Sequence, residues 1–157
     1  MRYLTTSVIA LDLSATCAPV TAHGTDGALV TFFGIVRADG TEPRRVHALY
    51  YEAHETMAER EIDRIAAEAR ERWLVTAIWI RHRLGLVECG QVSVAVVVAA
   101  PHRAKAYAAS QFLITRIKAQ VPIWKRAHYE DGTSAWSSTL HRDESAAPEE
   151  TVSHAHV

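Results

Sequence analysis

The stretch Val92-Ser93-Val94-Ala95-Val96-Val97-Val98-Ala99-Ala100, which ends at Pro101, decides the fold of this chain. It is the longest apolar run in the sequence, and its β-branched valines favour a strand. It is far shorter than the roughly 18 to 20 apolar residues that a membrane helix needs. We therefore predict that it forms a buried central strand in a soluble protein.

Upstream of this run, alternating and β-rich segments predict four further strands, at Tyr3–Leu11, Ala28–Val36, Val46–Ala53 and Ala77–Arg83. A short helix interrupted by its proline is expected at Ser14–Ala22. Two glycines indicate a turn region at Leu84–Gly90. Downstream, Ile123–Tyr129 is expected to return as a short strand.

Two segments predict the main helices. The first begins near Thr56, which forms a capping box with Glu59. Its apolar stripe consists of Met57, Ile62, Ile65, Ala66, Ala69 and Trp73, opposite a charged outer face. The second helix is expected at Arg103–Lys118 and must end before Pro122.

Length and composition predict one domain of the α+β class. The 157 residues are 48% hydrophobic, enough for one core but not for two full domains. The expected domain spans residues 1–142, with two main helices and a mainly antiparallel sheet. Residues 143–157 are rich in small, polar and acidic side chains, so we expect a disordered tail.

Charge and cysteine content exclude several classes of function. The net charge is −1 and long basic runs are missing, which argues against general nucleic-acid binding. Cys17 and Cys89 form neither a disulfide framework nor a metal motif, and the first residues do not resemble a secretory signal. The nine histidines are scattered. We expect a cytoplasmic protein with no metal and no other cofactor.

Positive charge is concentrated in one window. Between Cys89 and Tyr129 there is no Asp or Glu. The basic residues in this window are Arg103, Lys105, Arg116, Lys118, Lys125 and Arg126. Because a surface built only for solubility normally mixes both signs, this asymmetry predicts a site for a small anion.

Lys118 and Lys125 lie seven residues apart, on either side of Pro122, which ends the second helix. If the chain reversal brings them together, each ammonium disfavours the charge of the other. One pKa can then fall and yield an amine that acts as a base or nucleophile. The alternative is a pair of solvated surface lysines.

Two further places suggest anion binding. His102 and Arg103 lie where the central strand passes into the second helix, whose N-terminal amides favour an anion. A capping or packing role for His102 remains an alternative. Arg37 follows Gly34-Ile35-Val36 at a strand end, and the glycine would let a ligand approach the backbone closely. Trp124 is either a flat face for a heterocycle or a core residue.

Five motifs, in order, resemble the large, catalytic subunit of molybdopterin synthase over roughly residues 27–136. They are Phe33-Gly34-Ile35-Val36-Arg37, Tyr51-Glu52-Ala53 with Met57-Ala58, His82-Arg83-Leu84-Gly85, Pro101-His102-Arg103-Ala104 and Val121-Pro122-Ile123-Trp124-Lys125. The resemblance implies an α/β-hammerhead-like fold and a sulfurtransferase of molybdenum cofactor biosynthesis.

In that family, a small ubiquitin-like subunit carries sulfur as a thiocarboxylate on its C-terminal Gly-Gly tail. The sulfur converts cyclic pyranopterin monophosphate into molybdopterin, and two large subunits form a homodimer within a heterotetramer. The resemblance implies that Lys118 and Lys125 are catalytic. It also implies a substrate-binding set of Ile35, Val36, Arg37, His102, Arg103, Lys118, Lys125 and Arg126.

The sequence departs from the family pattern at a few positions. Ala127 replaces the usual glutamate, Gln91 replaces a common glutamate, and Asp131–Trp136 is one residue longer than usual. These changes leave two alternatives to the enzyme: a degenerate paralogue that binds the small subunit without efficient sulfur transfer, and a regulator that binds a nucleotide or pterin in the same basic pocket.

Overall fold

The computed structural model describes residues 3–10, 12, 24–39 and 44–136. The helix predicted at Ser14–Ala22 and the tail predicted at residues 143–157 lie outside the described residues. The division into one domain and a tail therefore stays a prediction.

The predicted central strand is confirmed. It is β6 (Val92–Ala100), all nine residues of which are buried. Sheet 1 has the order β1-β4-β6-β2, with β1 at Leu4–Thr5, β4 at Ala77–Arg83 and β2 at Ala28–Ile35. Within it β1 pairs in parallel with β4, whereas β6 is antiparallel to both neighbours. A strand buried on both faces must be apolar throughout, which explains why this run lacks alternation.

Sheet 2 has the order β5-β3-β7-β8 and is antiparallel throughout. Its strands are β5 (Gly85–Glu88), β3 (Val46–Ala53), β7 (Ile123–Tyr129) and β8 (Ser134–Trp136). The prediction of a turn over Leu84–Gly90 is wrong in part, because β5 lies inside it. Its two glycines, both at positive φ, lie at the start of β5 and just beyond its end.

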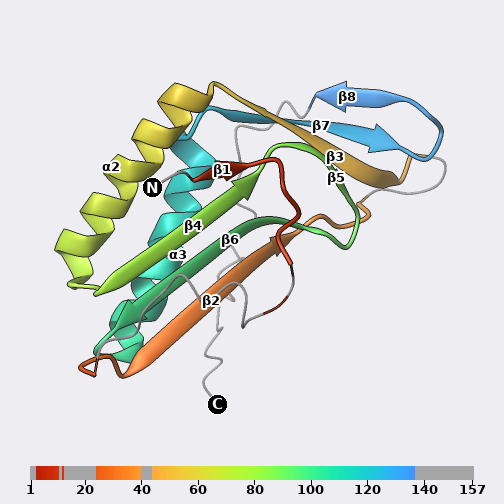
Figure 1. Cartoon of the computed structure of the whole chain (residues 1–157). Helices are drawn as coiled ribbons and strands as arrows, with labels where there is room; N and C mark the ends of the chain where they lie inside the picture. The colour runs from red at the N-terminus through yellow and green to blue at the C-terminus, as the bar shows by residue number, and fades with distance from the viewer. Residues whose placement is uncertain (1–2, 11, 13–23, 40–43, 137–157) are drawn as a thin grey trace, which may run out of the picture.

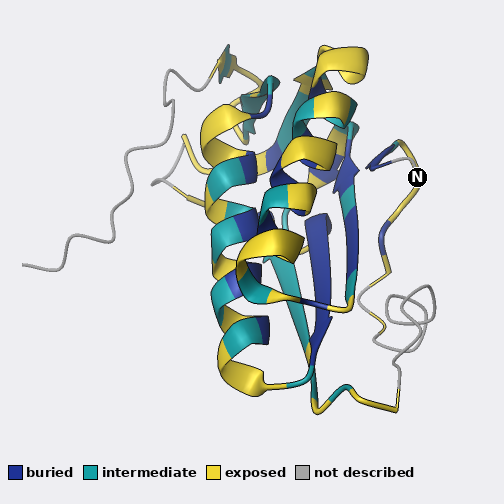
Figure 2. Cartoon of the chain, turned by 90° about the vertical axis from the view of Figure 1, so that its left-hand side faces the viewer, coloured by how far each residue is buried: buried dark blue, intermediate teal, exposed yellow. Residues whose placement is uncertain are grey.

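Helices α2 (Glu55–Trp73) and α3 (Arg103–Gln120) lie side by side on one face of sheet 1 (Figures 1 and 2). Their inner faces pack on β4 and β6, and the fully buried side chains there include Ile62, Ile65 and Leu113. Burying each of these apolar side chains contributes roughly 1.5–3 kcal/mol. The α+β class, with two main helices and mainly antiparallel pairing, is confirmed.

The predicted capping box of α2 is wrong. His54 is the N-cap, and its Nδ1 accepts a hydrogen bond from the Met57 amide at 3.4 Å. The Glu59 carboxylate instead accepts hydrogen bonds from the amides of Tyr3, at 2.8 and 3.0 Å, and Leu4, at 2.9 Å. A tertiary contact has displaced a local one, because the first strand offers amides that no neighbouring strand satisfies.

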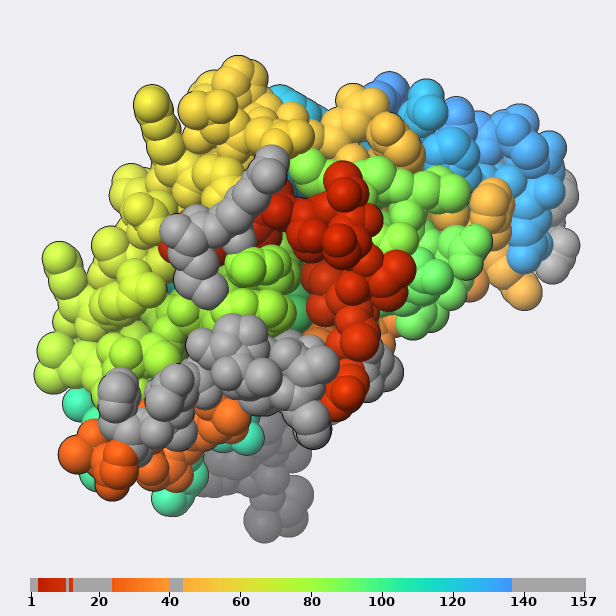
Figure 3. All heavy atoms as spheres, viewed as in Figure 1, coloured from red at the N-terminus to blue at the C-terminus, as the bar shows by residue number. Residues whose placement is uncertain are grey.

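The apolar stripe of α2 also differs from the prediction at its first position. Met57 is 56% exposed, and the neighbouring Ala58 is fully buried in its place. Ala58 belongs to the same core cluster as Tyr3 and Leu4 of the β1 segment. Figure 3 shows the exposed part of this first segment, in red, next to the green atoms of β4 and β5.

The strand predicted at Tyr3–Leu11 is shorter than expected. Only β1 forms, and Ile9 adds an isolated bridge to Val92. The Ser7 amide donates to Thr5 Oγ1 at 3.1 Å. Such local side-chain acceptors compete with strand pairing, so β1 ends there.

Candidate active site

The last turn of α3 and the start of β7 bring Lys118 and Lys125 together. The helix ends with the Val121 amide bonded to the Ile117 carbonyl at 3.2 Å, and β7 begins two residues later. The Pro122 carbonyl accepts a hydrogen bond from the His54 amide at 3.2 Å, which ties this reversal to the start of α2. The two lysines interact electrostatically across it.

Burial, the charge of Lys118 and the charge of Arg37 lower the pKa of Lys125, while Asp39 opposes the shift. Burial is the largest of these causes, because it withholds the water that would stabilise the ammonium. Lys125 is only partly exposed, so its surroundings differ from those of a solvated surface lysine. An amine with a lowered pKa can accept a proton or attack an electrophile at moderate pH.

The segment Ile35–Arg37 is fixed beside this pair by its backbone. The Val36 amide donates to the Gln91 carbonyl at 3.0 Å, and the Gly90 amide donates to the Val36 carbonyl at 2.8 Å. Val36 is 2% exposed, whereas Ile35 is 47% exposed. Within this segment, therefore, Val36 anchors the strand end and Ile35 and Arg37 present their side chains.

Arg37 forms an ion pair with Asp39. Its Nε lies 2.7 Å from Oδ1 and 2.9 Å from Oδ2 of that carboxylate, and both side chains are largely exposed. An exposed pair of this kind is worth about 0–1 kcal/mol. An incoming anion could therefore take over the guanidinium at little cost.

Gly34 has a role beyond the one predicted. A Cβ at this position would lie 2.5 Å from Cγ1 of Val94, so the missing side chain makes room for the neighbouring strand β6. The pairing of β2 with β6 shifts register immediately after it, between Gly34 and Ile35. The glycine therefore serves sheet packing, and its role in admitting a ligand stays a prediction.

His102 and Arg103 lie at the far end of α3. His102 is the N-cap but makes no side-chain capping bond, and both residues are exposed. The 15 residues from Arg103 to Lys118 span about 22 Å of helix. One chain therefore does not bring these two residues to the lysine pair.

Arg126 points away from Lys125, because successive side chains of a strand alternate between its faces. Its guanidinium carbon lies 5.9 Å from the ring of Tyr50 and 5.5 Å from the ring of Trp136. Trp124, on the same face, is 54% exposed. The alternative that Trp124 is a core residue is therefore wrong.

Not every basic residue of the acid-free window serves an anion site. Arg116 forms an ion pair with Glu68 of α2 at 3.1 Å. Cys89 in the same window donates its thiol to the Val46 carbonyl at 3.1 Å, and burial raises the pKa of that thiol. A thiolate nucleophile is therefore disfavoured there.

Two residues beneath the lysines, His82 and Tyr51, were not predicted as site residues from the sequence. His82 is 8% exposed, and its ring meets the ring of Tyr51 edge-on, with centroids 5.2 Å apart. Tyr51 is the cross-strand partner of Lys125. The motifs around both residues were visible in the sequence, but only the packing of β4 against β3 brings them under the lysines.

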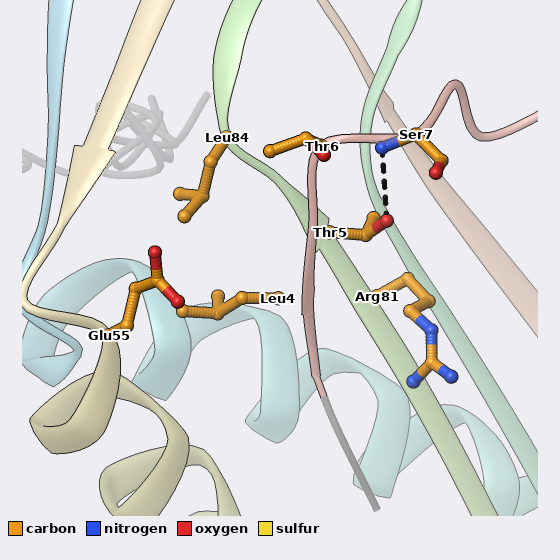
Figure 4. A pocket seen from close by; sticks show the side chains of 7 residues that line it. All are labelled: Leu4, Thr5, Thr6, Ser7, Glu55, Arg81 and Leu84. Atoms are coloured by element: carbon orange, nitrogen blue, oxygen red, sulfur yellow. Dashed lines mark hydrogen bonds between the residues drawn. The ribbon is translucent and has the colours of Figure 1, made fainter.

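A separate cavity of about 360 Å³ opens beside β1 (Figure 4). It is lined by the hydroxyl residues 5–7 together with Leu4, Glu55, Arg81 and Leu84. In the close-up, Glu55 and Arg81 lie on opposite sides of β1. None of the site residues predicted from the sequence lines it.

Within the described residues, no group of three or more His, Cys, Asp or Glu side chains could hold a metal ion. Neither helix of that part of the chain is long and apolar enough to cross a membrane.

The model of the MoaE protein family matches residues 7–120. The molybdopterin synthase catalytic subunit of Halalkalibacterium halodurans is 46% identical over 110 residues, which cover 70% of each chain. That of Bacillus subtilis is 43% identical over 106 residues, covering 68% of this chain and 67% of the relative. The family model covers the first four of the five motifs and ends just before the fifth.

Solved structures agree. Molybdopterin synthase from Staphylococcus aureus superposes with a TM-score of 0.79 at 33% identity, covering 88% of this chain and 97% of the other. A complex of subunits 1 and 2 of molybdopterin-converting factor from Helicobacter pylori gives 0.68 at 20% identity, over 87% and 89% of the chains, and shows a likeness of fold alone. The chain belongs to the MoaE family, whose curated members are catalytic subunits of molybdopterin synthase.

Proposed function

We propose that this chain is the catalytic subunit of a molybdopterin synthase, a sulfurtransferase of molybdenum cofactor biosynthesis. It transfers sulfur from the C-terminal thiocarboxylate of a small ubiquitin-like subunit to cyclic pyranopterin monophosphate, which yields the dithiolene of molybdopterin. The names of its relatives support the activity. The observation that carries the chemistry is the pairing of Lys118 with a partly buried Lys125.

The two lysines divide the catalytic work. Lys125, with its lowered pKa, assists proton transfer or captures the substrate covalently. Lys118 steadies the oxyanion that forms when the thiocarboxylate sulfur attacks or when its acyl product is hydrolysed. Each sulfur transfer leaves the tail as a carboxylate, whose new oxygen comes from water.

Arg37 binds the cyclic phosphate of the substrate. Its exposed position beside the lysines and its weak pairing with Asp39 support this role. Ile35 and Val36 shape the strand end that presents it, and Arg126 belongs to the same set through the resemblance. Guanidinium groups suit this task because they offer paired donors to phosphate oxygens.

His102 and Arg103 complete the phosphate site from a second copy of the chain. The span of about 22 Å along α3 separates them from Lys118 in one copy, so the proposed set needs a homodimer. The dimer would carry one small subunit at each outer end, as a heterotetramer. The Helicobacter pylori complex of two subunits is consistent with such a partner. We place the reaction in the cytoplasm, because the two cysteines suggest no disulfide framework.

The test is a reconstitution. The purified protein is mixed with thiocarboxylated small subunit and cyclic pyranopterin monophosphate, and molybdopterin is quantified. Lys118→Ala should abolish product while partner binding, measured by calorimetry, is retained. Lys105→Ala, at the other end of the same helix, is the matched control and should remain active. Loss of partner binding alone in Lys118→Ala would contradict the catalytic role.

Ala127 is the feature that would favour a degenerate paralogue. It shares the β7 face of Lys125, two residues away, where the family usually has a carboxylate. The relatives are named as catalytic subunits, which favours an active enzyme over a degenerate paralogue. Wild-type protein that binds the partner without making product, and that Ala127→Glu restores, would reverse this preference.

A further inference from the structure

The two site lysines stand over a pair of rings, the buried His82 and the partly buried Tyr51. Tyr51 on β3 lies directly opposite Lys125 on β7, so their side chains leave the sheet on the same face. On its other side, Tyr51 is opposite Gly85 of β5, which has no side chain. The ring of Tyr51 is therefore the cross-strand side chain that can cover the methylene groups of Lys125.

His82 extends this pair toward Lys118. It comes from β4 of sheet 1 and its ring meets that of Tyr51 at 76°, with centroids 5.2 Å apart. Its Nδ1 lies 3.0 Å from the Arg83 carbonyl, so Nδ1 carries the proton and donates it. The imidazole also lies close enough to Lys118 for the ammonium to disfavour its protonation.

Both rings are uncharged at neutral pH. Burial, and to a lesser extent Lys118, lowers the pKa of His82 to about 4. Burial also raises the pKa of Tyr51, whose hydroxyl is hydrogen-bonded to Ser93. The Ser93 hydroxyl donates to the Gly34 carbonyl at 3.1 Å, which links the rings to the strand that carries Arg37.

We propose that Tyr51 and His82 are positioning residues that form an uncharged floor beneath Lys118 and Lys125 and keep water from the Lys125 ammonium. The physical claim concerns this chain alone. Its role in catalysis rests on the proposed function, because an amine with a lowered pKa is unprotonated, and so able to accept a proton, closer to neutral pH.

The floor differs from the other groups around Lys125 because it acts by excluding water and not by charge. Lys118 from α3 and Arg37 from the loop after β2 repel the ammonium, and Asp39 from the same loop attracts it. Because burial is the largest cause of the lowered pKa, opening the floor should have a greater effect than removing any one of these charges.

Competitive acetylation measures this directly. The chain has three lysines, Lys105, Lys118 and Lys125, so mass spectrometry can follow each one separately. The protein is labelled with acetic anhydride between pH 6 and pH 11, and Lys105 serves as the internal reference for reagent dose. The assay needs neither substrate nor partner.

The variants are Tyr51→Thr, which opens the floor but keeps a β-branched strand residue, and Tyr51→Phe, which keeps the ring. Tyr51→Thr should move the Lys125 midpoint upward by about one pH unit, so that labelling at pH 8 falls about tenfold. Tyr51→Phe should stay within about twofold of wild type. Tyr50→Thr, on the opposite face of β3, controls for loss of a tyrosine and should leave the midpoint unchanged.

An unchanged midpoint in folded Tyr51→Thr, or an equal shift in Tyr51→Phe, overturns the proposal. Folding is checked by circular dichroism; if Tyr51→Thr does not fold, His82→Asn replaces it and must also raise the midpoint. In the reconstituted reaction, the acidic limb of the pH profile should move with the midpoint. A shifted midpoint in a protein that makes no molybdopterin would leave the floor in place and refute the proposed function instead.

Discussion

Sheet 1 and sheet 2 differ in how deeply they are buried. Every residue of β6, at the centre of sheet 1, is buried, whereas no residue of β7 in sheet 2 is. Helices α2 and α3 cover sheet 1 (Figure 2), while the outer face of sheet 2 exposes Leu86, Trp124 and Trp136. Sheet 1 supplies most of the buried apolar area, and hence most of the stability.

The difference gives a physical reason for the place of the proposed site, at the boundary of the two sheets. A lysine inside sheet 1 would lose too much hydration to be tolerated, and one on the outer face of sheet 2 would keep an ordinary pKa. Lys125 is on the inner face of sheet 2, dry enough for its pKa to fall and open enough for a substrate. The predictions that follow test this division.

Replacing Lys125 by arginine should give the largest effect. The charge is kept, but a guanidinium does not lose its proton at any working pH. Turnover of the reconstituted enzyme should fall by roughly 10²- to 10⁴-fold, with little change in stability. Lys105→Arg is the control. An active Lys125→Arg enzyme would mean that only the charge at this position matters.

In sheet 1, Ile80→Ala should cost about 2–5 kcal/mol of unfolding free energy, because the fully buried side chain leaves a cavity. In sheet 2, Leu86→Ala should cost less than about 1 kcal/mol, since Leu86 is 46% exposed. Urea titrations at one pH give both values. Equal losses would show that the two sheets share the stability.

The buried His82 should make stability depend on pH. Its pKa is about 4 in the folded chain and near 6.5 in the unfolded chain, so the unfolded state binds more protons between these values. Stability is therefore fully present above about pH 6.5 and declines by about 3 kcal/mol as the pH falls to 4. The measurement is urea unfolding of wild type and His82→Gln at both ends of this range; the same decline in both would rule out His82 as its source.

Gly34→Ala should cost about 1–3 kcal/mol of stability from overpacking. The added methyl group would lie 2.5 Å from Cγ1 of Val94. Val94→Ala in the same chain should recover part of this loss, in a double-mutant cycle read by thermal unfolding. If the second change gives no recovery, the contact between β2 and β6 does not explain the glycine.

The sequence predicted most strands and both helices because their signals are local. The bounds of β3, β4, β6 and β7 agree with those predicted, and each is a run of β-branched or aromatic residues between breakers. At the start of α2 the prediction failed because a distant group had intervened. Glu59 holds the amides of Tyr3 and Leu4 instead of capping its own helix.

For the site, the sequence picked out Lys118, Lys125 and Arg37 from charge and spacing. It could not show that His102 and Arg103 lie far along α3 from that pair, although the helix they begin was predicted. Nor could it find the floor of Tyr51 and His82, which come from strands of different sheets.

The sequence alone therefore determined most of the elements, the family motifs and the presence of two lysines across a helix end. Only the tertiary structure decided which face of β7 carries Lys125, what lies beneath it and how dry it is. The physical reason is the distance over which each kind of interaction acts. Strand and helix signals act over a few neighbouring residues, whereas the pKa of an amine depends on every group that the fold packs within a few ångströms of it.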